Sequence, residues 1–322
     1  MKEIILSGIR PTGKLHIGNY FGALKNFVEL QNKYECYFFI ADLHSLNEQF
    51  DPQIKHRQTV DLAKDFLAAG LDPKKCTIFT QSHMSEHSEL AVILSNVIPV
   101  SFLFRMTQYK DKSTDRAQEN VNAGLLFYPI LMAADILMYK PTKIPVGADQ
   151  TQHVELARDA AKFFNAKFGQ TFPEPQPLYT EVPKIMSLLE PDKKMAKSLG
   201  DNHCIYLEDE PEIIKKKISK AVTDTGDGKG LGAQNLLGLV KIFSNKKIFE
   251  RLTADKNAGN LKYSELKEQL AQDIADYFYD FREKKKKITD AQAAKVLTLG
   301  SKRAKKVAAK TMEEVRQKIG IG

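Results

Sequence analysis

The chain has 322 residues, of which 43% are hydrophobic and 27% are charged, and its formal net charge is +8 at pH 7; this suits a globular protein of about two domains with a sizeable buried core. Its longest apolar runs, such as residues 4–6 and 36–41, are far shorter than the roughly 18 residues of a membrane-spanning helix, and residues 1–3 do not lead into a secretory signal. The cysteines are scattered and few (Cys36, Cys76 and Cys204), which indicates a reducing cytoplasm and excludes a zinc site or a disulfide framework.

Residues 1–200 alternate between predicted strands and helices. Buried strands are predicted at residues 4–6, 36–41, 77–79 and 143–146. Helices are predicted at residues 20–30, 51–70, 85–97, 129–139 and 150–164. This alternation predicts a doubly wound, Rossmann-like parallel sheet that is covered on both faces.

The pattern changes near Asp201, and no strand is predicted after Tyr206. Apolar residues recur there at helical spacing, first Leu266, Leu270, Ile274, Tyr277, Phe278 and Phe281, and then Ala304, Val307, Ala308, Val315 and Ile319. Residues 223–230 have the composition of a loop. The expected fold class is α/β, with a Rossmann-like parallel-sheet catalytic domain at residues 1–200 and an all-helical C-terminal domain at residues 201–322.

The positive charge is concentrated in the second part of the chain. Residues 212–322 hold 25 Lys and Arg against 14 Asp and Glu, a net charge of +11, so residues 1–211 carry the remaining −3. The asymmetry indicates a chemical domain followed by a domain that binds a polyanion. Solvated, lysine-rich helical faces would give the same composition.

The turn after the first predicted strand contains residues that shape the backbone. Gly8 lets a ligand approach the chain without a Cβ in the way, and Pro11 and Gly13 form the turn. His16 and Asn19 stand near the start of the next helix, where free N–H groups and the helix dipole favour phosphate. The stretch matches neither a Walker A loop nor GxGxxG. By itself it favours an ordinary strand–turn–helix over a phosphate site.

A second stretch, residues 189–200, places three lysines and a serine in a segment that ends in glycine. Lys194 and Lys197 are three residues apart in a flexible loop, where they could clamp a pyrophosphate as its charge grows in a transition state. An exposed basic loop is the plain alternative. Together the two stretches resemble the paired signatures of class I aminoacyl-tRNA synthetases: residues 16–19 are similar to the HIGH motif and residues 194–198 to the KMSKS motif. Their order, and a separation that spans the whole α/β region, carry the resemblance.

The region between these motifs resembles one family more narrowly, the bacterial tryptophanyl-tRNA synthetases, at residues 105–113, 128–139 and 147–159. The resemblance runs along essentially the whole chain and is weakest in the helical tail. It implies activation of L-tryptophan with ATP to tryptophanyl-AMP and pyrophosphate, and transfer of tryptophan to tRNA(Trp). It further implies a cytoplasmic homodimer with no membrane or DNA partner, Mg²⁺ carried by ATP with no metal site in the protein, and a tRNA anticodon-binding domain at residues 201–322.

Met132 and Asp135 are three residues apart and are expected to share one face of a helix. Asp135 can accept a hydrogen bond from an indole N–H, while Met132 packs against the ring. Phenylalanine would leave a buried carboxylate unpaired, and sites built in that way can reject such analogues by roughly 10⁴–10⁵. Two alternatives are an aspartate paired with a nearby Lys or Arg, and a site for tyrosine, whose hydroxyl also suits an aspartate.

The resemblance implies roles for a larger set of residues. Catalysis would rest on His16, Asn19, Lys112, Lys194 and Lys197. ATP would be bound by Arg10, Pro11, Thr12, Gly18, Asn19, Gly147, Ala148, Asp149, Ile185, Lys194, Met195, Ala196, Lys197 and Ser198. Tryptophan would be bound by Leu6, Gly8, His44, Tyr128, Met132, Asp135, Val146 and Gln150, with Tyr128 and Gln150 on its ammonium group.

Three positions depart from the family pattern, because the family usually carries glutamine at Arg10, glutamate at Ala148 and serine at Ala196. Arg10 adds charge near the triphosphate, from which tighter ATP binding is expected. Ala196 loses a hydroxyl in a loop that keeps its lysines, and Ala148 alters the expected contacts to the ribose.

Three other functions compete with this interpretation. A tyrosyl-tRNA synthetase is disfavoured by residues 132–139 and 147–159. Another nucleotidyltransferase of the same fold, one that makes a cofactor, would generally be shorter and would not need a basic helical domain. A non-catalytic RNA-binding paralogue would not need to keep Lys194, Lys197 and Asp135.

Overall fold

The computed structural model of the chain describes residues 2–107, 109–110, 122–147, 150–180, 183–224 and 230–321. The chain forms two compact units. Met1–Gly13, Asn26–Glu181 and Thr289–Gly322 form the first, called the sheet unit here, and Lys14–Lys25 and Val182–Ile288 form the second, the helical unit.

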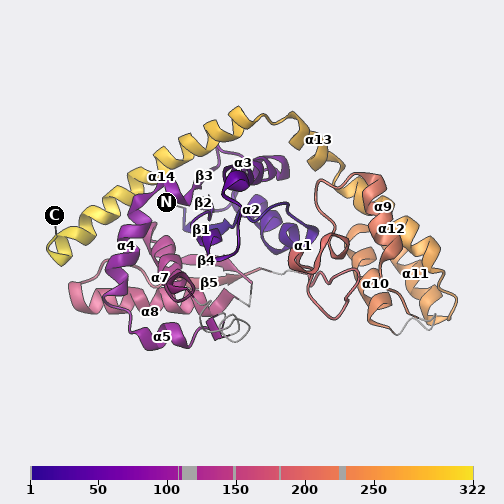
Figure 1. Cartoon of the computed structure of the whole chain (residues 1–322), viewed down its shortest axis with the longest axis horizontal. Coiled ribbons are helices and arrows are strands. Elements are labelled where there is room, and N and C mark those ends of the chain that lie inside the picture. The colour runs from indigo at the N-terminus through magenta and orange to yellow at the C-terminus, as the bar shows by residue number, and fades with distance from the viewer. Residues whose placement is uncertain are drawn as a thin grey trace. The chain divides into compact units, whose positions relative to one another are not determined.

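The sheet unit is built on a parallel sheet with the strand order β3-β2-β1-β4-β5 (Figure 1). Its strands are β1 (Ile4–Ile9), β2 (Glu35–Ile40), β3 (Cys76–Thr80), β4 (Lys143–Val146) and β5 (Gln176–Tyr179). β2 is buried at every position after its first residue, as expected for a parallel strand that is covered on both faces. The parallel sheet and its first four strands are confirmed. β5 is an edge strand that contains Pro177 and is only partly buried, so it lacks the apolar run that predicted the others.

Helices pack around this sheet: α3 (Pro52–Ala69), α4 (Ser85–Ser95), α5 (Val100–Phe104), α7 (Ala123–Met138), α8 (Thr151–Phe168) and α14 (Asp290–Ile319). α3 is capped as its sequence predicts, since the Asp51 side chain accepts from the Gln53 N–H and Gly70 ends the helix at φ +110°. The predicted start of α7 at Pro129 is wrong. Asn122 caps this helix, and Pro129 lies inside it.

Helix α14 packs along the edge strand β3 and against α3 and α4 (Figure 1). The contact with β3 depends on Gly300, because a Cβ there would lie 1.7 Å from the backbone oxygen of Ile78. Ala304 and Ala308, one and two turns further on, are also fully buried. A row of small residues thus lets this helix approach the strand closely.

The helical unit consists of α9 (Pro211–Lys220), α10 (Leu231–Phe243), α11 (Lys246–Asn257), α12 (Tyr263–Tyr277) and α13 (Tyr279–Lys287), together with an early segment of the chain. That segment contains α1 (Ile17–Asn19) and a π-helix (Tyr20–Leu24), and it continues into α2 (Lys25–Leu30). Aromatic rings attach it to the later helices: the Tyr20 and Phe278 ring centroids are 5.1 Å apart, and those of Phe21 and Phe243 are 5.5 Å apart.

The two compact units do not follow the predicted division at residue 200. Residues 183–200 lie in the helical unit, and α14 lies in the sheet unit. Helical spacing identifies α14 as a helix, but it does not reveal which surface its apolar face covers. Among the helices that the structure describes, none has the length and apolar character to cross a bilayer.

We predict that Gly300→Ala lowers the free energy of unfolding by about 1–3 kcal/mol, because the added methyl group meets the β3 backbone. Gly238→Ala on α10 is the matched control: a Cβ there would meet no atom within 4 Å, so the substitution should raise the free energy of unfolding by up to about 1 kcal/mol. Urea unfolding followed by circular dichroism measures both. Equal effects of the two substitutions would contradict the close packing of α14.

Candidate active site

His16 and its neighbours start the first helix of the helical unit. The side-chain oxygen of Asn19 accepts from the His16 backbone N–H at 3.1 Å. Two further backbone bonds fix this segment from outside, since the Ile17 N–H donates to Ile205 and the Leu207 N–H donates to the Leu15 carbonyl. The start of α1 is therefore held by residues 205–207.

The loop that carries the lysines forms a short hairpin in the same unit. The Met195 N–H donates to the Ile185 carbonyl at 3.0 Å, and the Ser187 N–H donates to Lys193 at 2.9 Å. Met195 and Ile185 are buried. Lys197 starts a single turn of 3-10 helix that ends at Gly200, where φ is +117°. Buried Met195 thus anchors the loop, while Lys194 next to it is exposed.

His16 lies within electrostatic reach of both lysines. Burial is the largest cause, with the charges of Lys197 and Lys194 adding to it, and together they lower the pKa of the His16 imidazole to about 4. The ring is therefore neutral at pH 7. Its buried Nδ1 has no hydrogen-bond partner among the described residues, and a Cβ on Gly18 would lie 2.9 Å from that atom. A neutral donor or acceptor beside two cations is suited to a polyphosphate.

Other residues predicted to bind ATP lie in the sheet unit, namely Arg10, Pro11, Thr12 and Gly147. The Arg10 guanidinium donates to the Glu48 carboxylate at 2.6 Å, and the Pro11 carbonyl accepts from the Lys55 ammonium at 3.1 Å. The charge that Arg10 was expected to add is thus offset by Glu48 in this structure. Lys112, Ala148 and Asp149, also predicted site residues, lie outside the described residues.

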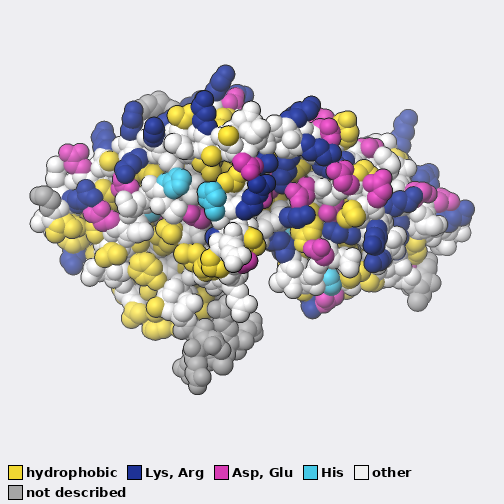
Figure 2. All heavy atoms as spheres, turned by 45° about the horizontal axis from the view of Figure 1, so that its top comes forward, with side chains coloured by type: hydrophobic (Ala, Val, Ile, Leu, Met, Phe, Trp, Pro, Cys, Tyr) yellow, Lys and Arg dark blue, Asp and Glu magenta, His cyan; other side chains and the backbone are white. Residues whose placement is uncertain are grey.

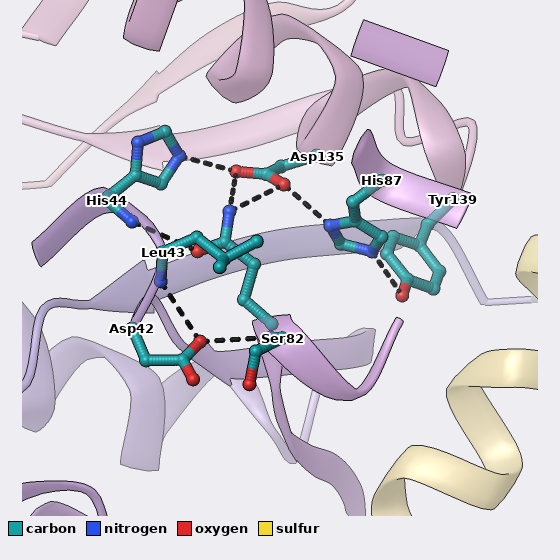
Figure 3. A network of polar contacts seen from close by, with 8 residues as sticks. Asp42, Leu43, His44, Ser82, His87, Asp135 and Tyr139 are labelled. Atoms are coloured by element: carbon teal, nitrogen blue, oxygen red, sulfur yellow. Dashed lines mark hydrogen bonds and ion pairs between the residues drawn. The ribbon is translucent and has the colours of Figure 1, made fainter. Parts of the chain in front are cut away.

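The predicted tryptophan-binding residues all belong to the sheet unit, and Asp135 on α7 is their most buried polar member. Its carboxylate accepts from three side chains: His44 Nε2 at 2.7 Å, His87 Nδ1 at 2.6 Å, and Gln81 Nε2 at 2.9 Å from both oxygens. Figure 3 shows His44 on one side of the carboxylate and His87 on the other, with Tyr139 beyond His87. His87 Nε2 and the Tyr139 hydroxyl are 2.9 Å apart.

Asp135 stays ionised although it is fully buried. Burial on its own raises the pKa of this carboxyl, but the hydrogen bonds and charges of His44 and His87 outweigh burial and hold the pKa below its usual value. The aspartate is therefore an anion surrounded by donors.

The remaining tryptophan-site predictions lie on several elements of the sheet unit. Gly8 on β1 faces Phe39, since a Cβ there would lie 2.9 Å from the Phe39 ring. The Tyr128 hydroxyl on α7 lies 3.1 Å from His153 Nε2, and burial raises the pKa of Tyr128 to about 12. The others are buried Leu6 on β1, half-buried Met132 on α7, half-buried Val146 at the end of β4, and half-buried Gln150 just before α8.

Sequence reasoning missed Gln81, His87 and Tyr139. Gln81 directly follows β3, just as His44 closely follows β2, and polar residues at the carboxyl ends of parallel strands were a usable signal. His87 and Tyr139 gave no such signal in the sequence. The expectation that phenylalanine would leave Asp135 unpaired is wrong, because three side chains already donate to the carboxylate without any ligand.

A cavity of about 450 Å³ lies at the carboxyl ends of β2 and β3, lined by Asp42, Lys55, Thr80, Ser82 and Leu297 among others. Asp42 connects the two strand ends, because its carboxylate accepts from the backbone N–H groups of Leu43 and Ser82 (Figure 3). None of the predicted site residues lines this cavity. It is therefore separate from the Asp135 cluster.

Comparison with known proteins gives a consistent result. The family model of the class I tRNA synthetases (W and Y) matches residues 2–314. The chain is 43% identical to a tryptophan–tRNA ligase from Caldanaerobacter subterraneus over 98% of each chain, and 41% identical to one from Helicobacter pylori over 99% of each. It is also similar to the crystal structure of tryptophanyl-tRNA synthetase from Campylobacter jejuni complexed with ADP and tryptophan, with a TM-score of 0.88, 34% identity, and coverage of 99% of this chain and 100% of that chain.

We predict that the His16 imidazole stays neutral until the pH falls to about 4. The unfolded chain binds this proton near pH 6.5, so the folded state loses stability as the pH falls from 6.5 towards 4 and gains none above that window. NMR titration of the histidine rings measures the pKa, with His16→Asn to assign the signal. A midpoint near 6.5 would show that His16 is not buried beside the lysines.

Proposed function

The chain belongs to the class I tRNA synthetases of the W and Y family, and from this premise we propose that it is a tryptophan–tRNA ligase. The tryptophan carboxylate attacks the α-phosphorus of ATP, the bond to the bridging oxygen breaks, and pyrophosphate leaves. The acyl group of tryptophanyl-AMP then moves to a 3′-terminal ribose hydroxyl of tRNA(Trp), which releases AMP. The observation that carries the proposal is similarity along the whole chain to ligases of this name.

In this proposal catalysis is positioning and charge stabilisation, with no nucleophile from the protein. Lys194, Lys197 and Lys112 stabilise the leaving pyrophosphate, and His16 and Asn19 hold ATP at the start of α1. The lowered pKa of His16 beside the two loop lysines supports this assignment. A neutral ring can donate to a phosphate oxygen without adding to the repulsion between nearby cations.

The remaining ATP contacts are assigned to Arg10, Pro11, Thr12, Gly18, Gly147, Ala148, Asp149, Ile185, Met195, Ala196 and Ser198. Mg²⁺ would reach the site on the ATP phosphates and neutralise part of their charge. The part of the chain that the structure describes has no group of three His, Cys, Asp or Glu side chains that could hold a metal ion, and the lysine-rich loop fits a phosphate-bound metal better than a protein-bound one.

Tryptophan is assigned to the cluster around Asp135. The buried carboxylate accepts the indole N–H, and Tyr128 and Gln150 bind the ammonium group. Leu6, Gly8, His44, Met132 and Val146 form the rest of the pocket. The ionised state of buried Asp135 supports this assignment, because a charged acceptor roughly doubles the strength of a hydrogen bond.

We extend the proposal to a tRNA anticodon-binding role for residues 201–322 and to a homodimer in the cytoplasm. The net charge of +11 over residues 212–322 supports contact with a polyanion. Apolar side chains that are about half exposed, Val92 on α4 and Val100 and Phe104 on α5, support a face that a second copy covers.

Amino-acid-dependent exchange of labelled pyrophosphate into ATP tests the adenylation step, run with tryptophan, tyrosine and phenylalanine in parallel. We expect exchange with tryptophan alone. Asp135→Asn should lower kcat/KM for tryptophan at least a hundredfold. The amide removes the negative charge, and its NH₂ group would face the N–H donors that surround this position. Thermal melting checks that the variant folds. Exchange with tyrosine would indicate a tyrosyl-tRNA synthetase instead. No exchange with any of the three amino acids would indicate a non-catalytic paralogue.

A further inference from the structure

The carboxylate of Asp135 is surrounded by three side-chain N–H donors in this structure. A carboxylate offers about four lone-pair positions; here one oxygen accepts from His44, the other accepts from His87, and Gln81 Nε2 contacts both. Because the Asp135 side chain is only 1% exposed and lies among these donors, an indole N–H can reach the carboxylate only if one of them withdraws. Which donor withdraws decides how the pocket distinguishes tryptophan from a ligand of the same shape.

The three donors differ in how firmly they are held. Gln81 and the His87 side chain are 0% exposed. His87 is further fixed through Nε2 by the Tyr139 hydroxyl, and the Gln81 side-chain oxygen accepts from the His44 backbone N–H at 3.4 Å. The His44 side chain is 10% exposed, and its ring has no polar partner other than Asp135 among the described residues.

We propose that Gln81 and His87 are positioning residues that hold Asp135 for the indole N–H of tryptophan, and that His44 is the donor that the indole replaces. This inference rests on the proposed function and concerns how the amino-acid site recognises the indole N–H of its substrate. The donors at the back of the carboxylate keep it charged and oriented. The least buried donor, His44, stays on the carboxylate until tryptophan binds.

Tyr139 contributes by fixing the tautomer of His87. When Nδ1 of a neutral imidazole donates to Asp135, Nε2 must accept, and the Tyr139 hydroxyl is the donor that it meets. The series of hydrogen bonds from Tyr139 through His87 to Asp135 therefore directs the Nδ1 proton of His87 towards the carboxylate.

Removing a fixed donor and removing the exchangeable donor have opposite consequences. Loss of His87 or Gln81 frees a lone pair that faces buried protein, where no ligand reaches, so the carboxyl turns or takes up a proton and its bond to indole weakens. Loss of the His44 ring nitrogens frees the lone pair on the less buried side of the carboxylate. Tryptophan should then bind more favourably, because it no longer has to displace a donor.

The test compares tryptophan with 3-(benzothiophen-3-yl)alanine, in which sulfur replaces the indole N–H while the shape is kept. The measured quantity is the ratio of kcat/KM for the two substrates in pyrophosphate exchange. We expect His87→Leu and Gln81→Met to lower this ratio about tenfold. His87→Asn, whose amide nitrogen takes the place of Nδ1, should keep it within about twofold of wild type, and His44→Phe should raise it.

A merely structural role for these residues would lower kcat/KM for both substrates alike and leave the ratio unchanged, and that result would overturn the inference. A ratio that His87→Asn fails to restore would overturn the role of the Nδ1 donor, and a fall with His44→Phe would overturn the exchange. If wild-type protein shows no tryptophan-dependent exchange, the proposed function fails instead, so the two failures are distinguishable.

A separate observation concerns the solvent face of α14. Lys295, Lys302, Lys306 and Lys310, called the lysine stripe here, are all exposed, and helical geometry places them within an arc of about 80° over a length of about 22 Å. Residues 291–312 contain no Asp or Glu. Within the described part of the chain, no acidic side chain lies within 4 Å of these four ammonium groups. Figure 2 shows lysine and arginine side chains spread over this face.

We infer that the lysine stripe binds the phosphate backbone of RNA, which under the proposed function is tRNA. Unpaired ammonium groups in a row can each contact a phosphate and release its counterion without first breaking an ion pair. The opposite side of the helix is buried against the sheet unit through Leu297 and Ala304. The stripe is therefore held on a rigid element.

The test is Lys302→Glu with Lys306→Glu, against Lys162→Glu with Lys167→Glu at two exposed positions of α8, which changes the net charge equally. We expect the stripe variant to lower kcat/KM for tRNA charging at least tenfold and to reduce the slope of log(kcat/KM) against log[salt] by about two. Pyrophosphate exchange without tRNA should stay at the wild-type level in both. Equal charging by the two variants would overturn the assignment.

Discussion

A charge that is buried in a protein must be paired, since an unpaired ion costs several kcal/mol in the interior, and Asp135 imposes this constraint on the sheet unit. Its donors come from three different places: His44 from the turn after β2, Gln81 from the turn after β3, and His87 from α4. One carboxylate on α7 thus fixes the ends of two strands and the start of a helix. The geometry of this cluster follows from the need to pair one buried anion.

The helical unit solves the opposite electrostatic problem. Two cations, Lys194 and Lys197, lie near a buried imidazole, and the protein avoids a third positive charge by keeping His16 neutral. The missing Cβ of Gly18 makes room for the ring. One unit therefore holds a buried anion that its own donors stabilise, and the other holds two cations beside a neutral imidazole.

Much of the fold and part of the site could be predicted from sequence, for a physical reason. Buried parallel strands are continuous apolar runs, so β1 to β4 were readable, and Asp135 was conspicuous as a carboxylate in an apolar helix. Partners that come from distant segments were not readable. The periodicity of apolar residues does not predict that His87 bonds to Asp135, or that Gly300 allows α14 to pack closely against β3. The early aromatic pair Tyr20 and Phe21 likewise gives no sign that its partners lie some 220 residues or more later.

The segment that pairs with His16 is itself held by a buried ion pair. The Tyr206 N–H donates to Asp209 at 2.9 Å, and the same carboxylate accepts from Lys217 on α9 at 2.7 Å, with the ammonium 4.3 Å from the Tyr206 ring centroid. A buried pair of this kind contributes little net stability compared with apolar side chains of similar volume. Apolar side chains, however, could not accept the Tyr206 N–H. The ion pair is therefore best understood as orienting residues 205–207, and through them the start of α1, so that α9 and His16 keep one fixed geometry within the helical unit.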